Sequence, residues 1–286
     1  ALNHALSANV SASSGLSEGV KANLRATIDY LELANVHLVH GDVPNPAEVT
    51  EFFVRQNYVD FLNREPDEEG LAYWAGEIDR CGADAQCRQV RRINVSAAFF
   101  LSIESQETGV LVHRLYKASY ARSPTLAEFA PDAEEIGRGL IVGAPGWNRK
   151  LEQNKSEFYS QWVRRAGFAA RYGNLTNAQY VDALIANAGV MVSDEERASW
   201  VAALNAGEQR DYALRRLVEH GDFVRGEYAT AFVMMQYMGY LRRDPDAGGF
   251  NFWLTKLNEY GGDYNRAEMV RAFIESIEYN DRFRNR

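Results

Sequence analysis

The sequence has no long apolar segment. The longest strongly apolar stretch runs from Ala229 to Leu241. It is shorter than the about 18 consecutive apolar residues that span a bilayer, and Gln236 and Gly239 interrupt it. The sequence therefore predicts no membrane span.

Positive charge is also scarce. The chain has 31 Lys and Arg against 39 Asp and Glu, so its net charge is −8 and its pI about 5.3. Proteins that bind nucleic acid need a basic surface to neutralise phosphates, so we expect no nucleic-acid partner. Hydrophobic residues make up 46%, which is near the globular average and sufficient for a buried core.

Residue patterns of catalysis and metal binding are missing. Of the five histidines only His37 and His40 are close, and no third ligand is evident beside them. Ser17 stands in a Gly-x-Ser-x-Gly string, but a small polar segment precedes it, whereas a nucleophile elbow follows a buried strand. No phosphate-binding Gly loop or calcium loop occurs. We expect a protein that is not an enzyme, with no catalytic residues, no metal and no cofactor.

Cysteine occurs only at positions 81 and 87. An even count at short spacing in a secreted protein predicts a local disulfide, Cys81–Cys87; a reduced pair of buried thiols is the alternative. The first residue is Ala1 rather than Met, which fits removal of an export signal, although a trimmed chain would look the same. Together these features favour a secreted or cell-surface protein.

Two segments of the chain resemble each other closely. Residues 53–74 and 232–253 align without a gap, and nine of the 22 pairs are identical, a level typical of internal repeats. The pairs are Phe53/Phe232, Val54/Val233, Tyr58/Tyr237, Leu62/Leu241, Arg64/Arg243, Pro66/Pro245, Asp67/Asp246, Gly70/Gly249 and Trp74/Trp253. Further on, residues 102–104 and 276–278 both read Ser-Ile-Glu.

Two weaker copies are expected between these segments. Tyr116, Arg122 and Pro124 keep part of the spacing, and Ser193 and Trp200 repeat the order of cap and tryptophan. Apolar residues follow helical spacing, so each unit predicts helix, tight loop, helix, turn and helix. The expected fold is all-α, with about four tandem helical repeats behind an N-terminal arm and an amphipathic helix over residues 17–33. The expected division is residues 1–50 for the arm and helix, then repeats at 51–110, 111–175, 176–226 and 227–286.

The shared motif is predicted to have structural roles. Pro66 is expected to end the first helix, because the residue before a proline is pushed out of the helical basin. Asp67 is placed to cap the next helix, and this use is favoured over a carboxylate site for calcium or glycoside hydrolysis. Arg64 is expected to bind a helix-end carbonyl or a carboxylate, and Trp74 to anchor the core.

The motif Arg-x-Pro-Asp-x-x-Gly-x-x-aromatic-Trp, at residues 64–74 and 243–253, resembles that of the bacterial domain of unknown function 4214. In pattern it is also similar to the phycobilisome linker domain, a helical scaffold that joins other proteins. The resemblance covers roughly residues 50–286. It implies secreted or surface proteins of bacteria and no catalysis.

Two functions remain open from the sequence. The first is a non-catalytic helical-repeat scaffold that mediates protein–protein assembly, with copies of itself as partners through the N-terminal arm, in an extracellular filament or layer. The alternative is a carbohydrate-binding module, in which Trp147 and Trp162 stack on surface glycans. Trp147 lies in a Gly- and Pro-containing loop, so it either contacts a ligand or partner there or folds back onto the repeats.

Overall fold

The computed structural model describes residue 21 and residues 45–284. In these residues every regular element is a helix and none is a strand, so the predicted all-α class is confirmed. The N-terminal arm, His37, His40 and most of the predicted amphipathic helix lie outside the described residues; Lys21, within that helix, is helical. No helix in the described ranges is long and apolar enough to cross a bilayer.

The helices follow one another with short connections. Their bounds are η1 Pro46–Glu48, α3 Thr50–Leu62, α4 Glu68–Asp79, α5 Ala85–Leu101, α6 Ile103–Glu107, α7 Gly109–Tyr120, α8 Leu126–Gly137, α9 Trp147–Trp162, α10 Ala166–Tyr172, α11 Asn177–Ala188, α12 Asp194–Asn205, α13 Arg210–Val218, α14 Gly221–Gly226, α15 Tyr228–Gln236, the π-helix η2 Tyr237–Leu241, α16 Ala247–Glu259, α17 Met269–Ile274 and α18 Ile277–Arg284.

One local structure recurs within residues 45–284. A helix ends at a residue in the left-handed conformation. The N-cap of a second helix follows four residues later, and that helix begins at the next residue. The left-handed residues are Asn63, Ala121, Gly189 and Arg242, with φ of 52°, 58°, 65° and 53°, and the N-caps are Asp67, Thr125, Ser193 and Asp246. A left-handed residue stops a helix because it turns the chain away from the helix axis. That the four helix groups starting at α3, α7, α11 and α15 are copies of one unit stays a prediction.

The first helix of this unit is shorter than the proline position suggests. Pro66 is expected to end it, yet α3 ends at Leu62 and Asn63 already has left-handed geometry. The same holds at the other end of the chain, where η2 ends at Leu241 before Pro245. The proline lies in the loop and not at the helix end.

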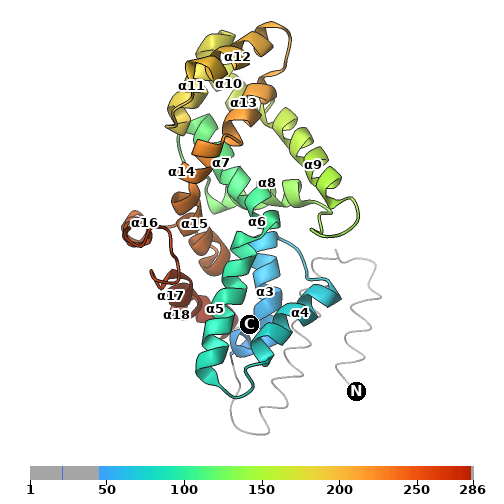
Figure 1. Cartoon of the computed structure of the whole chain (residues 1–286), viewed down its shortest axis with the longest axis vertical. Coiled ribbons are helices and arrows are strands. Elements are labelled where there is room, and N and C mark those ends of the chain that lie inside the picture. The colour runs from blue at the N-terminus through green and yellow to red at the C-terminus, as the bar shows by residue number, and fades with distance from the viewer. Residues whose placement is uncertain (1–20, 22–44, 285–286) are drawn as a thin grey trace.

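The chain folds back so that its first and last helices lie together (Figure 1). Helices α7 and α9–α13 form one end of the molecule, while α3–α5 and α15–α18 form the other. Contacts join α3 to η2 and α5 to α17. At the opposite end α7 packs on α11 and α9 on α13. At each end of the molecule two units are paired in the same way. The first helices of the two units are in contact (α3 with η2, and α7 with α11), and so are their third helices (α5 with α17, and α9 with α13).

Aromatic rings and polar side chains fill the contact between α3, α5 and η2. Phe61 meets Tyr240 edge-on with ring centroids 4.9 Å apart, and both residues are buried. The buried hydroxyls of Ser96 and Tyr240 share a hydrogen bond, and Ser96 also donates to Asn57. Burial raises the pKa of Tyr240. This contact ties residues near the start of the described chain to those near its end.

Candidate functional site

The first motif forms one connected cluster at the start of α4. Asp67 caps the helix, since its Oδ1 accepts a hydrogen bond from the backbone N–H of Gly70 at 2.8 Å. Arg64 forms a bidentate ion pair with Glu104 of α6, at 2.7 and 2.9 Å. The same guanidinium lies 4.9 Å from the ring centre of Tyr58. The motif therefore joins the first, second and fourth helices of its unit.

The second motif has the same geometry at the start of α16. Asp246 accepts from the N–H of Gly249 at 2.8 Å. Arg243 pairs with Glu278 of α18 at 2.5 and 3.1 Å and lies 5.1 Å from the ring centre of Tyr237. Both capping roles predicted from the sequence are present. The carboxylate partners Glu104 and Glu278 were not predicted, although they stand in the Ser-Ile-Glu segments that the two copies share.

The motif tryptophans occupy matching positions. Trp74 and Trp253 are half-buried, and each ring packs against a phenylalanine of the third helix in its unit. The matching ring pairs are Trp74–Phe99 and Trp253–Phe273, both at 5.6 Å, and Tyr58–Phe99 and Tyr237–Phe273, at 4.7 and 5.0 Å. Each tryptophan covers the edge of the core rather than its centre.

Ionisation at the two motifs follows from these contacts. Burial, followed by the nearby charge of Asp67, raises the pKa of Tyr58. The hydrogen bond from the backbone N–H of Gly249 lowers the pKa of Asp246. The hydrogen bond with Glu278 raises the pKa of Arg243. Each motif thus contains an ion pair and a tyrosine that stays neutral near pH 7, because burial raises the pKa of Tyr237 as it does that of Tyr58.

Glycine is required at the third position of α4, because a Cβ at Gly70 would overlap the hydroxyl oxygen of Tyr58. We expect Gly70→Ala to lower the free energy of unfolding by about 1–3 kcal/mol, as overpacking does in other cores. Gly76→Ala in the same helix meets no atom within 4 Å, and should be neutral or stabilising by about 0.5–1 kcal/mol.

Urea denaturation followed by circular dichroism measures both changes. The double variant Gly70→Ala/Tyr58→Phe removes the hydroxyl and should recover most of the loss. If Gly70→Ala unfolded at the same urea concentration as Gly76→Ala, the steric role of this glycine would be wrong.

Large apolar side chains are exposed beside each motif. Tyr73 and Phe252 precede the two motif tryptophans, and each is 58% exposed. Ile103 and Ile277 precede the two paired glutamates and are 52% and 75% exposed. Exposed apolar groups are common singly, but here they occur at the same positions of both motifs.

The second unit keeps the arginine but changes its partners. Arg122 lies 5.2 Å from the ring centre of Tyr116 and forms a bidentate pair with Glu128 at 2.8 and 2.7 Å. Glu128 also completes a capping box with Thr125. These hydrogen bonds, that from Arg122 above all, lower the pKa of Glu128 from 4.5 to about 2.

The Arg122–Glu128 pair predicts an acid dependence of stability. The pKa of Glu128 is lower in the folded protein than in the unfolded chain. The pair therefore stabilises the protein above about pH 4.5, and this stabilisation is lost as the pH falls towards about 2. The pair is partly exposed, so its contribution is about 1 kcal/mol or less. Glu128→Gln should therefore flatten the fall in melting temperature over this range. Glu134→Gln, an exposed glutamate of the same helix, is the control; equal acid dependence in both variants would contradict the prediction.

The third unit keeps the predicted cap and tryptophan. Ser193 and Glu196 form a capping box at the start of α12. Trp200 is buried, and its ring centre lies 6.5 Å from that of His220. No arginine–glutamate pair like that of Arg64 was predicted for this unit.

The structure corrects the prediction for Trp162 as a ligand or partner contact. Trp162 is 0% exposed, its ring meets Tyr116 edge-on at 4.9 Å, and its Nε1 donates to Ser119 Oγ at 2.9 Å. Trp162 packs against Tyr116 in the second unit as Phe99 packs against Tyr58 in the first. Its ring is therefore unavailable to an external ligand. Trp147 is half-buried at the first residue of α9 and packs against the core, which is the fold-back alternative.

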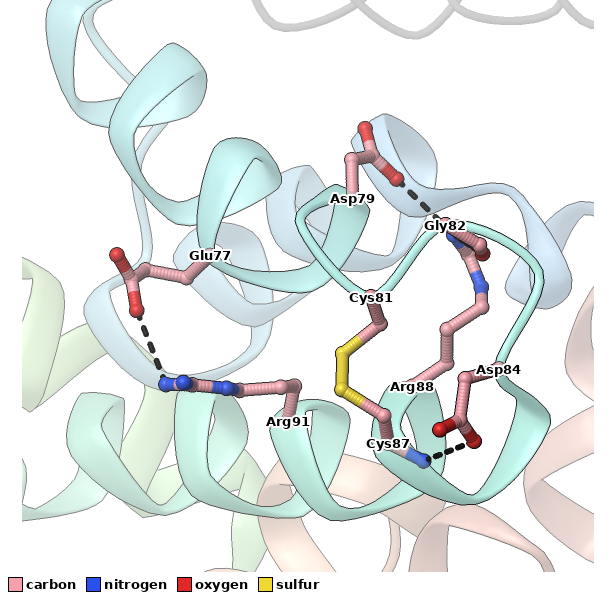
Figure 2. The surroundings of a disulfide bond; sticks show 8 residues. All are labelled: Glu77, Asp79, Cys81, Gly82, Asp84, Cys87, Arg88 and Arg91. Carbon is pink, nitrogen blue, oxygen red and sulfur yellow. Dashed lines mark hydrogen bonds and ion pairs between the residues drawn. A yellow bond between two sulfur atoms is a disulfide. The ribbon is translucent and has the colours of Figure 1, made fainter.

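A disulfide joins Cys81 and Cys87, as predicted. It fastens the end of α4 to the first turn of α5 (Figure 2). Asp84 caps α5 by accepting from the N–H of Cys87 at 3.0 Å, and Glu77 pairs with Arg91 at 3.1 Å across the same two helices. The bridge closes a short loop, so it fixes one turn and removes little chain entropy.

The cluster around Arg243 lies within a recognised domain. Residues 222–283 match the family model described as domain of unknown function (DUF4214). The chain carries a DUF4214 domain there. This DUF4214 domain includes the second motif, its partner Glu278 and the exposed Phe252 and Ile277. The comparisons with curated proteins and with solved structures found no match.

Proposed function

We propose that the chain is a non-catalytic helical scaffold that binds protein partners, copies of itself first, on the two faces that carry the motifs. The observation that supports this most strongly is the exposure of Tyr73 and Phe252 at matching positions. Aromatic side chains held on a rigid framework are typical anchors of protein interfaces. The rings of Tyr73 and Phe252 each pack edge-on against the neighbouring tryptophan, with ring centres 5.0 Å apart. Because this contact already restricts the two side chains, little side-chain entropy is lost on binding.

The surrounding residues fit binding rather than catalysis. In both motifs the arginine is committed to a glutamate and the aspartate to a helix N-terminus. No group of three or more His, Cys, Asp or Glu in the described part of the chain is arranged to hold a metal ion.

The proposal extends to location and family. The Cys81–Cys87 disulfide supports an oxidising compartment, so we place the chain outside the cell or at the cell surface, in a bacterium. The DUF4214 domain supports this proposal, and the motif's likeness in pattern to the phycobilisome linker domain motivates the linking role. The N-terminal arm, residues 1–50, is a second candidate contact between copies.

Sedimentation velocity over a range of concentrations tests self-association. We expect the full chain to form oligomers, and the dissociation constant to rise by at least about tenfold in Tyr73→Ser/Phe252→Ser, because the loss of even one hot-spot aromatic costs about 1.4 kcal/mol or more. The control is Met191→Ser, since Met191 is 90% exposed and far from both motifs in sequence. Deleting residues 1–40 separates the contribution of the arm. A monomer at all concentrations, unchanged by any of these variants, would contradict the proposal.

A further inference from the structure

A polar pocket lies where the first three units meet. Its volume is about 170 Å³, which is comparable to an engineered cavity of about 150 Å³ that holds benzene. Its walls come from α6, α7, α9, the end of α13 and α14. The lining residues are Gln106, Glu107, Arg114, Lys155, Glu219 and Val224.

One wall of the pocket is an ion-pair group of one lysine and two glutamates. The side chain of Lys155 is 5% exposed and lies 2.7 Å from Glu107 and 2.8 Å from Glu219. Both glutamates remain about one-third exposed. The lysine is therefore satisfied, while each glutamate keeps oxygen lone pairs that can accept further hydrogen bonds.

Arg114 differs, because it is buried without a counter-ion. The residue is 4% exposed, and its only hydrogen bond in the described chain runs from Nε to the carbonyl oxygen of Val218, at 3.0 Å. Its two Nη atoms donate no hydrogen bond to any described residue, and Arg114 lines the pocket. Burial lowers the pKa of this guanidinium. A buried charge without a partner is costly, and a planar guanidinium fits a carboxylate with two parallel hydrogen bonds.

The charges of the pocket select the ligand. Glu219 also pairs with Arg215, which in turn pairs with Glu152. The three cations Arg114, Lys155 and Arg215 balance the three carboxylates of Glu107, Glu152 and Glu219, so the pocket and its adjoining ion pairs are neutral overall. An anion alone would leave it with a net negative charge, whereas a zwitterion would keep it neutral and give both Arg114 and the glutamates a partner. We propose that this pocket binds a small zwitterion of the free amino acid type, with its carboxylate on Arg114 and its ammonium group towards Glu107 and Glu219.

This site is independent of the assembly proposed above, because Tyr73 and Phe252 do not line it. The volume accommodates up to about nine non-hydrogen atoms, which is the size of glycine, alanine, serine and similar small amino acids. No amino-acid pattern in the sequence signals it.

Isothermal titration of the full chain with single amino acids tests the site, with acetate and ethylammonium as probes that carry only one of the two charges. We expect a small amino acid to bind at least about tenfold more tightly than either probe, and to raise the melting temperature. Arg114→Lys keeps a cation but loses the two-pronged donor, and Arg114→Gln removes the charge; both should weaken binding by about tenfold or more.

Asp211→Asn, in a separate hollow lined by Ser156 and Tyr159, is the control and should bind as the wild type does. Circular dichroism shows whether each variant folds. If Arg114→Gln does not fold, the binding measured with Arg114→Lys tests the proposal. The proposal is overturned if no small amino acid binds, if acetate binds equally well, or if both Arg114 variants bind unchanged.

Discussion

Replacing Arg282 with alanine is expected to destabilise the protein by about 3 kcal/mol, the lower end of the cost of breaking a buried ion pair, because Arg242, 4.0 Å away, and Gln56 stay beside the Asp60 carboxylate. Asp60 of α3 is 3% exposed. Its carboxylate receives two hydrogen bonds of 2.9 Å from Arg282 of α18. The same guanidinium donates to the carbonyl oxygens of Gly239 and Tyr240 in η2. This side chain therefore links α3 to α18 and η2, beside the aromatic contact of Phe61 with Tyr240.

Equilibrium unfolding in urea measures this effect. Arg284→Ala is the matched control, because Arg284 lies on the same helix in an exposed pair with Asp281, and its loss should cost about 0.5 kcal/mol or less. The double variant Asp60→Asn/Arg282→Gln removes both charges and should be more stable than Arg282→Ala. A loss below about 1 kcal/mol in Arg282→Ala would show that this ion pair contributes little to holding the two ends together.

Trp162→Ala is expected to cost about 3–5 kcal/mol, the range for deleting a large buried aromatic side chain. Its ring packs against Tyr116 and Phe158, and Arg165 lies 4.3 Å from the ring centre, so the neighbours cannot collapse far into the space. Trp147→Ala removes a side chain of the same size that is only half-buried and should cost less.

Thermal and urea unfolding of the two variants distinguish the roles of these tryptophans. A large loss in Trp162→Ala with a smaller loss in Trp147→Ala is the expected order. If Trp162→Ala were as stable as the wild type, its ring would be free for a ligand and its placement in the core would be wrong.

The sequence predicts the local parts of this fold well. Asp67 and Asp246 are read as helix caps because a capping side chain and its backbone partner are three residues apart. The Cys81–Cys87 bridge is also short-range. In each case the decisive contact lies within a few residues.

The long-range parts were not predictable in the same way. Arg64 was expected to bind a carboxylate or carbonyl, but Glu104 stands 40 positions away, and only the repeated Ser-Ile-Glu segment pointed to it. Trp162 was misjudged because its partner, Tyr116, lies on another helix. The end of α3 at Leu62 differs from the prediction because the left-handed conformation of Asn63 already ends the helix three residues before Pro66. The sequence around Arg114 does not show that this residue is buried, since its burial depends on helices from three units.

Cross-linking between chains tests the proposed assembly most directly. The native cysteines are paired, so Tyr73→Cys and Phe252→Cys each introduce one reactive thiol on a motif face, and Met191→Cys introduces one elsewhere. A short thiol-specific cross-linker should yield covalent dimers of the full chain from the two motif-face variants and almost none from Met191→Cys. Equal yields from all three variants, or no dimers from any, would contradict assembly through the motif faces.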